Sequence, residues 1–177
     1  MSNVLALDAS TKRTGYAFFR DGKIQYGAIA SSSTSPEKRI ATMRDEILKI
    51  IKQEKIDKII MEEVRPDGMN QHTGKLLTWL QGCIAVAVYE YNKNIKIEYI
   101  GASTWRSKLG LQGYRVLRAE QKKRDIDYAN QKYGLQLSAE MDDEADAIDI
   151  LTAYLDGAET AATSRPLGPI GSDESAF

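Results

Sequence analysis

The feature that most constrains the fold is an Asp21-Gly22 pair between two strand-like runs, residues 14–20 (TGYAFFR) and 23–30 (KIQYGAIA). Asp-Gly suits the positive φ angles of a two-residue hairpin turn, so the two runs are predicted to be antiparallel neighbours. A third apolar run, residues 3–8 (NVLALD), comes just before them. The chain is therefore expected to begin with a three-stranded antiparallel meander, around which the remaining elements must pack.

After the meander, helix-like and strand-like segments alternate. Ser35 followed by Pro36 is a typical helix start, and apolar side chains repeat at helical spacing beyond it. Two strand-like runs each follow a long helix, which favours parallel pairing. We therefore predict an α/β fold with a mixed five-stranded sheet, three meander strands plus two parallel strands, flanked by helices. The expected elements after the meander are helix 36–54, strand 57–64, helix 74–92, strand 95–100, helix 103–109, helix 116–133 and helix 141–156.

Composition limits the class of protein. With 177 residues, 42% of them hydrophobic and 28% charged, the chain is expected to form one globular domain over residues 1–160 and a disordered tail over 161–177. No apolar run is long enough to span a bilayer and no signal peptide is evident, so no membrane partner and a cytoplasmic location are expected. One cysteine and one histidine exclude an internal disulfide and histidine- or cysteine-rich metal centres, so any metal must bind to carboxylates.

Charge is distributed unevenly along the chain. Residues 96–134 carry nine basic and four acidic side chains, whereas residues 135–177 carry one basic and ten acidic ones. Solvated helix faces are the ordinary explanation of such segregation. The alternative is a basic surface beside an acidic pocket, which suits an enzyme that binds a polyanion and holds cations at its centre.

Four carboxylates are candidates for one site. Asp8 ends the first strand and Glu62 lies near the end of the fourth; if these strands are parallel, both acids lie at the same edge of the sheet. Asp143 and Asp146, three residues apart, share one face of the last helix. Clustered carboxylates repel one another unless cations lie between them, and oxygen donors favour Mg²⁺ or Mn²⁺. Alternatively, Asp8 is a turn residue and Asp143 complements the helix dipole. Asp149 is expected to be an outer or surface acid.

Three motifs together resemble one family. LALDASTKRTGYAFF resembles the opening motif of the RuvC family of Holliday junction resolvases, IIMEEV its second acidic motif, and DEADAIDI its C-terminal motif, in the same order over residues 3–156. ASTWRSKLG resembles the variant found in bacteriophage members. The resemblance implies a ribonuclease-H-like fold, a homodimer, and Mg²⁺- or Mn²⁺-dependent paired nicking of a four-way DNA junction.

The resemblance also assigns roles to residues. It implies that Asp8, Glu62, Asp143 and Asp146 are catalytic and hold about two metal ions per site. It matches a lysine that contacts the scissile phosphate to Lys123, with Lys122 as a close alternative. In the loop 65–73 bacterial members place an aromatic residue; this chain has none, which keeps a broader branched-DNA nuclease open. The DNA-binding candidates are Lys12, Arg13, Arg65, Asn70, Arg115, Arg118 and Lys122.

Other residues receive more ordinary interpretations. Thr14-Gly15 is expected to shape the entry to the hairpin, and Arg106 is expected to be a surface charge in a DNA-facing region. Trp79, Trp105 and Cys83 are predicted to pack in the core. The largely apolar helix 74–92 is predicted to lie centrally or at a subunit interface.

Two rival functions stay open from the sequence. One is a catalytically idle module that binds junctions or other nucleic acids, although clustered acids would weaken such binding. The other is a ribonuclease-H-like nuclease that acts on RNA-containing substrates, because recognition of the 2′-hydroxyl depends on side-chain geometry. A sugar-kinase-like ATPase is excluded, since 177 residues leave no room for its second domain.

Overall fold

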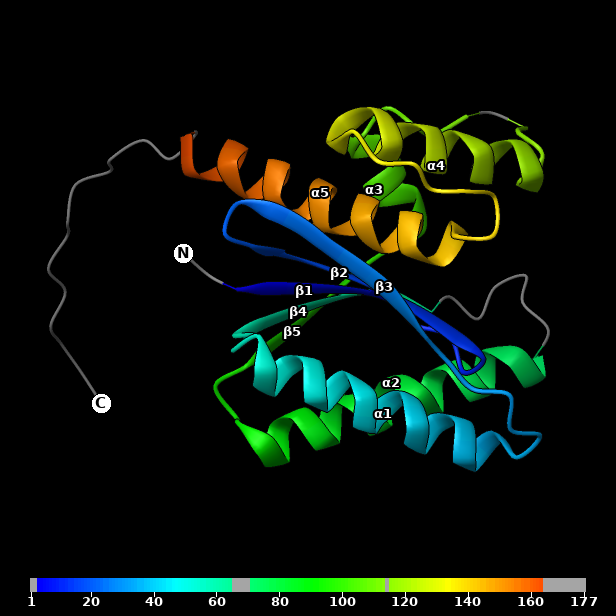
Figure 1. Ribbon diagram of the computed structural model, residues 1–177, viewed down its shortest axis with the longest axis vertical. Helices are drawn as coiled ribbons and strands as arrows, with labels where there is room; N and C mark the ends of the chain where they lie inside the picture. Colours follow the sequence, from blue (N-terminus) through cyan, green and yellow to red (C-terminus); the bar gives the residue numbers. More distant parts are fainter. Residues whose placement is uncertain (1–2, 65–70, 114, 164–177) are drawn as a thin grey trace, which may run out of the picture.

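The computed structural model describes residues 3–64, 71–113 and 115–163, with side chains described up to residue 157. Five strands form one sheet in the order β3-β2-β1-β4-β5 (Figure 1). The first three pair antiparallel, whereas β4 is parallel to both β1 and β5, which confirms the predicted mixed sheet. The strands are β1 (Val4–Asp8), β2 (Arg13–Arg20), β3 (Lys23–Ala30), β4 (Lys58–Glu62) and β5 (Lys96–Ile100).

The hairpin between β2 and β3 closes as the sequence predicts. Arg20 pairs with Lys23 across a two-residue loop, and the loop residues Asp21 and Gly22 have φ angles of 51° and 74°. Both angles lie in the left-handed region that Asp-Gly tolerates. The register set by this turn runs without interruption to the pair Arg13 and Ala30 at the far end of the hairpin.

Helices cover both faces of the sheet (Figure 1). On one face, α1 and α2 pack over Leu5, Leu7 and Ile59, and on the other, α5 packs across β1 and β2 with α3 and α4 beside it. Alternate residues of β1 thus enter two separate cores, because successive strand side chains point to opposite faces. The helices are α1 (Pro36–Gln53), α2 (Gln71–Tyr91), α3 (Ala102–Lys108), α4 (Arg118–Tyr133) and α5 (Asp142–Thr163).

A close contact between β2 and α5 fixes the start of the last helix. A Cβ atom built on Gly15 would lie 1.9 Å from the backbone oxygen of Asp143, so only glycine permits this approach. Next to it, Thr14 is fully buried, and its hydroxyl donates a 2.6 Å hydrogen bond to the backbone oxygen of Ser10. The structural interpretation of Thr14-Gly15 is therefore confirmed, and its consequence is to bring the first turn of α5 to the edge of the sheet.

Several expectations about packing are wrong. Trp79 is 48% exposed and Cys83 is exposed, whereas Trp105 is fully buried as predicted. The reason is that α2 buries the face that carries Leu80, Ile84 and Val88, whereas Cys83 lies in a groove beside Leu48 of α1. Asp149, expected to be an outer or surface acid, is a fully buried residue of α5, so the surface alternative is wrong.

Element boundaries also shift. The second helix begins at Gln71 rather than residue 74, the fourth at Arg118 rather than residue 116, and α5 continues to Thr163, past its predicted end. The rest of the predicted tail lies outside the described residues. None of the helices in the described ranges is long and apolar enough to cross a membrane.

Candidate active site

The structure brings the four candidate carboxylates into one pocket of about 460 Å³. Asp8 is the last residue of β1 and Glu62 the last of β4, and these strands are parallel neighbours, so both acids lie at the same sheet edge. The first two turns of α5 bring Asp143 and Asp146 to the same pocket. The start of α4 forms its outer wall through Arg118, Gln121 and Lys122.

Burial, and for Asp8 also the charges of its neighbours, raises the pKa values of these acids. Desolvation, followed by the charges of Asp146, Glu62 and Asp143, raises the pKa of Asp8 well above its usual value. Burial raises the pKa of Asp146 to about 7, and it also raises the pKa values of Glu62 and Asp143. Because these four buried carboxylates are costly to ionise together, a cation bound between them would be strongly favoured.

Arg106, expected from the sequence to be a surface charge in a DNA-facing region, lies instead with its guanidinium among the carboxylates. Its Nε donates a 3.0 Å hydrogen bond to Oδ2 of Asp125, and its Nη2 lies 3.5 Å from Oδ2 of Asp146. The guanidinium carbon stands 4.1 Å from the centre of the Trp105 ring. Its charge lowers the pKa values of Asp8, Glu62 and Asp146, against the effect of burial. In the sequence, the only indication of this role is that Arg106 follows Trp105, which is predicted to be buried.

Glu62 is held in place from two sides. The Nε1 atom of Trp105 donates a 2.9 Å hydrogen bond to Oε2 of Glu62, and Nε2 of Gln81 donates a 2.7 Å bond to the Glu62 backbone oxygen. Trp105 is therefore more than a core residue, because its indole orients a candidate metal ligand.

Two further acids lie beneath the pocket. Asp125 of α4 is fully buried and accepts hydrogen bonds from Arg106 and, at 2.8 Å, from Gln121. Asp149 lies one helical turn beyond Asp146, and neither of its oxygens has a hydrogen-bond partner among the described residues. Burial, together with the charge of Asp125, raises the pKa of Asp149 to about 9, so its carboxyl group is protonated at neutral pH. These acids support the site from behind rather than lining it.

Basic residues border the pocket unequally. Arg13 is bound to the first turn of α5, with Nε 3.0 Å from Oδ2 of Asp143 and a second ion pair to Glu144. Lys122 lines the pocket and pairs with Asp142, whereas Lys123 pairs with Asp127 on the exposed side of α4 and does not line it. The structure therefore brings the alternative lysine, Lys122, to the site.

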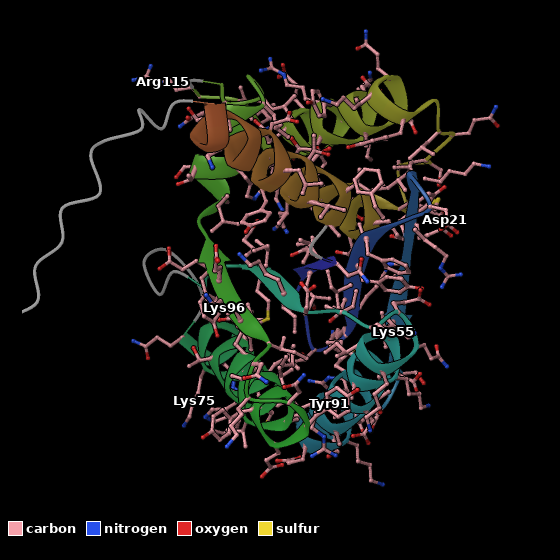
Figure 2. The ribbon with its side chains drawn as sticks, turned by 90° about the vertical axis from the view of Figure 1, so that its left-hand side faces the viewer. Asp21, Lys55, Lys75, Tyr91, Lys96 and Arg115 are labelled. Atoms are coloured by element: carbon pink, nitrogen blue, oxygen red, sulfur yellow. The ribbon has the colours of Figure 1, made fainter. Side chains whose placement is uncertain are left out.

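The remaining DNA-binding candidates come from separate parts of the chain, and only some of them lie near the carboxylate pocket. Lys12 is exposed on the turn between β1 and β2, and Arg118 is exposed at the start of α4, where it lines the pocket. Arg115 has a φ angle of 56° and lies beside the helical layer that contains α5 (Figure 2). Arg65 and Asn70 lie outside the described residues.

The donor chemistry of the pocket fits a hard divalent cation. Four carboxylates share it, three of which raise the pKa of the fourth, Asp8, and oxygen donors are the ligands that Mg²⁺ and Mn²⁺ prefer. Among the described residues, no three histidine, cysteine, aspartate or glutamate side chains are grouped closely enough to form a ready-made metal centre. Arg13 and Arg106 supply part of the compensating charge in this conformation.

The mixed sheet with two acids at the shared edge of β1 and β4 defines a ribonuclease-H-like α/β protein. The family described as Lactococcus phage M3 protein (DUF3882) matches residues 1–156, and the chain belongs to this phage protein family. No curated protein sequence matches it.

Solved structures of Holliday junction resolvases share the fold at low sequence identity. Thermus thermophilus RuvC bound to a Holliday junction substrate is 15% identical, with a TM-score of 0.69 over 90% of this chain and 96% of that one. The yeast mitochondrial resolvase Ydc2 is 16% identical, with a TM-score of 0.60 over 93% and 82%. The fowlpox virus resolvase, in complex with junction DNA, is 16% identical, with a TM-score of 0.55 over 88% and 98%. These similarities confirm the ribonuclease-H-like fold.

Proposed function

We propose that the protein is a structure-selective DNA endonuclease that resolves Holliday junctions, and also cuts other branched DNA, by metal-dependent hydrolysis of phosphodiester bonds. The observation that carries the proposal is the convergence of Asp8, Glu62, Asp143 and Asp146 on one pocket bordered by basic side chains. A fold shared with resolvases from a bacterium, yeast mitochondria and a virus supports it. The nuclease domain is proposed to span residues 1–160 and to act in the cytoplasm of the host cell.

The four carboxylates would hold two Mg²⁺ or Mn²⁺ ions. When bound, such ions activate the attacking water and stabilise the leaving 3′-oxygen, which gives a 5′-phosphate and a 3′-hydroxyl. Trp105 keeps Glu62 oriented for this task. Arg106, anchored by Asp125, stabilises the negative charge that develops on the scissile phosphate. Lys122 and Arg118, on the outer wall of the pocket, bind the phosphates that flank it.

We further propose that two copies of the chain assemble through α2. Trp79, Cys83 and Val86 recur at helical spacing on one side of α2, where Trp79 is 48% and Val86 59% exposed. Cys83 and Val86 line a groove whose other wall is α1. Tyr89, 67% exposed, continues this apolar face, and Tyr91 marks the end of the same helix in Figure 2. A two-fold dimer would present two active sites to a junction of matching symmetry and would make paired nicks.

Cleavage assays with purified protein test the activity and its rivals. We expect synthetic four-way junctions to be cut with Mg²⁺ or Mn²⁺ but not with EDTA, and the Asp8→Asn variant to be inactive while it still binds the junction. Plain duplex serves as the negative control. Tight junction binding without cleavage in either metal would favour the idle binding module, and preferential cutting of RNA–DNA hybrids would favour the RNA-directed nuclease.

A further inference from the structure

A second pocket, of about 450 Å³ and lined by residues of polar types, lies along the same sheet edge as the carboxylates and shares none of its lining residues with the carboxylate pocket. Its wall consists of Lys12 from the β1–β2 turn, the loop residues 31–34, and Arg39 from α1. The backbone N–H of Ser31 donates a 2.9 Å hydrogen bond to the backbone oxygen of Lys12, which joins the loop to the turn. Figure 1 shows the loop from β3 to α1 beside the β1–β2 turn, below the start of α5.

Arg39 is the unusual member of this pocket. It is only 8% exposed, yet no described carboxylate forms an ion pair with it. Its Nη1 donates hydrogen bonds to the backbone oxygens of Ser33 and Thr34, at 3.0 and 3.2 Å. Within the described parts of the chain, Nε has no hydrogen-bond partner. The charge of Arg39 is one cause that lowers the pKa of the exposed Glu37, but no described carboxylate is within ion-pair distance of the guanidinium. A buried cation without such a partner is costly, so a bound anion would stabilise it.

The other groups of the pocket suit an anion as well. The loop residues carry four hydroxyl groups, Ser31, Ser32, Ser33 and Thr34, and Lys12 is exposed and forms no ion pair with a described carboxylate. The loop leads directly into the N-terminus of α1, whose dipole favours negative charge. No aromatic side chain among the described residues lines the pocket, so these residues offer no surface on which a base would stack.

We propose that this pocket binds a phosphate of the DNA backbone next to the cleaved strand position, and so fixes the register of the strand at the active site. Lys12 precedes Arg13, whose guanidinium contacts Asp143 of the carboxylate pocket, so these two consecutive residues link the two pockets. Contacts of this kind position DNA without reading its sequence. The assignment rests on the proposed function, because it takes branched DNA as the ligand.

Binding of a fluorescent four-way junction tests this assignment. All variants are made in the Asp8→Asn protein, called the parent, because this substitution prevents cleavage. Lys12→Gln and Ser32→Asp are introduced into the parent separately. Loss of one phosphate contact should weaken binding by roughly three- to tenfold and reduce the slope of log affinity against log salt by about 0.9. Ser32→Asp should weaken binding similarly by repulsion, since Ser32 is exposed. Lys38→Gln, an exposed change on α1 outside the pocket, is the matched control.

Junctions with a single neutral methylphosphonate identify the contact. The parent should lose affinity when the contacted phosphate is neutralised, and Lys12→Gln should be insensitive to the same replacement. Arg39→Gln, if circular dichroism shows that it folds, should also be insensitive to this replacement. Unchanged affinity and salt slope in Lys12→Gln and Ser32→Asp would overturn the phosphate site while leaving junction cleavage by the unmodified protein intact. A parent that fails to bind any junction would instead overturn the proposed function and this site with it.

Discussion

Arg106 connects the acidic pocket to the interior of the protein. Its guanidinium lies between Asp125 and Asp146 and over the ring of Trp105, whose indole in turn holds Glu62. This chain of contacts means that an arginine on α3, an indole beside it and an acid on α4 act as one unit around the carboxylates. Charge stabilisation by such a fixed cation is worth the most where water is largely excluded.

We therefore predict that Arg106→Gln lowers the single-turnover cleavage rate about 100-fold or more while junction affinity changes little. Asp125→Asn should lower the rate less, because it weakens the contact that orients Arg106 but leaves the positive charge of Arg106 in place. Arg106→Lys should retain part of the activity that Arg106→Gln loses. Rapid-quench cleavage and equilibrium binding on the same junction give the two numbers. Equal losses of binding and rate in Arg106→Gln would mean that this arginine serves affinity alone.

A second residue-scale prediction concerns the protonated Asp149. Its folded pKa of about 9 lies far above the usual aspartate value, so the folded protein holds one more proton than the unfolded chain over the window between them. The free energy of unfolding should therefore fall as pH rises from about 4 to about 9, with a limiting slope of roughly 1.4 kcal/mol per pH unit from this group.

Asp149→Asn removes this titrating group, so the free energy of unfolding should decrease less steeply with rising pH. Urea denaturation of both proteins at pH 5, 7 and 8.5, in the presence of EDTA, measures the effect. The variant should gain stability relative to the original protein as pH rises. Parallel pH profiles for the two proteins would show that Asp149 is ionised in the folded state.

At the scale of elements, the contact of β2 with α5 sets where two of the carboxylates lie. Gly15→Ala would place a methyl group against the Asp143 backbone oxygen, so either the strand or the helix must move. We expect a loss of roughly 1–3 kcal/mol of stability and a larger relative loss of cleavage, because the first turn of α5 is displaced. Thermal unfolding and cleavage rates measure both.

Gly74→Ala on α2 is the matched control for that change. No described atom lies within 4 Å of a Cβ built there, and alanine favours a helix, so stability should stay the same or rise by up to about 1 kcal/mol. If Gly15→Ala matches Gly74→Ala in both thermal stability and cleavage rate, the close contact between Gly15 and the Asp143 backbone does not position α5.

The exposed apolar face of α2 is the second element-scale feature. Val86→Glu and Tyr89→Glu should convert a dimer to monomers in light scattering and should abolish paired cutting before they abolish single nicks, since each subunit keeps its own carboxylates. Gln131→Glu, which adds the same charge to an exposed position of α4, should leave the assembly unchanged. An unaltered mass for Val86→Glu and Tyr89→Glu would move the interface elsewhere.

For the molecule as a whole, local patterns were enough to predict the sheet and the edge that holds the acids. The Asp21-Gly22 turn determines the hairpin, and helices between the later strands force parallel pairing, which brings Asp8 and Glu62 together. The neighbours of Arg106 and Lys122 could not be predicted, because they depend on how α3 and α4 pack against α5. For the same reason Trp79 and Trp105, both in helices, differ completely in exposure.

The most direct test of the central claim is cutting of a supercoiled plasmid that extrudes a cruciform. A dimer that holds the two-fold junction should make both nicks before it dissociates, so Mg²⁺ should yield linear DNA with hairpin ends whose nicks DNA ligase can seal. The Asp8→Asn variant and EDTA should leave the plasmid supercoiled. Nicked circles without linear product, or cutting that survives EDTA and loss of Asp8, would contradict a metal-dependent, paired-nicking resolvase.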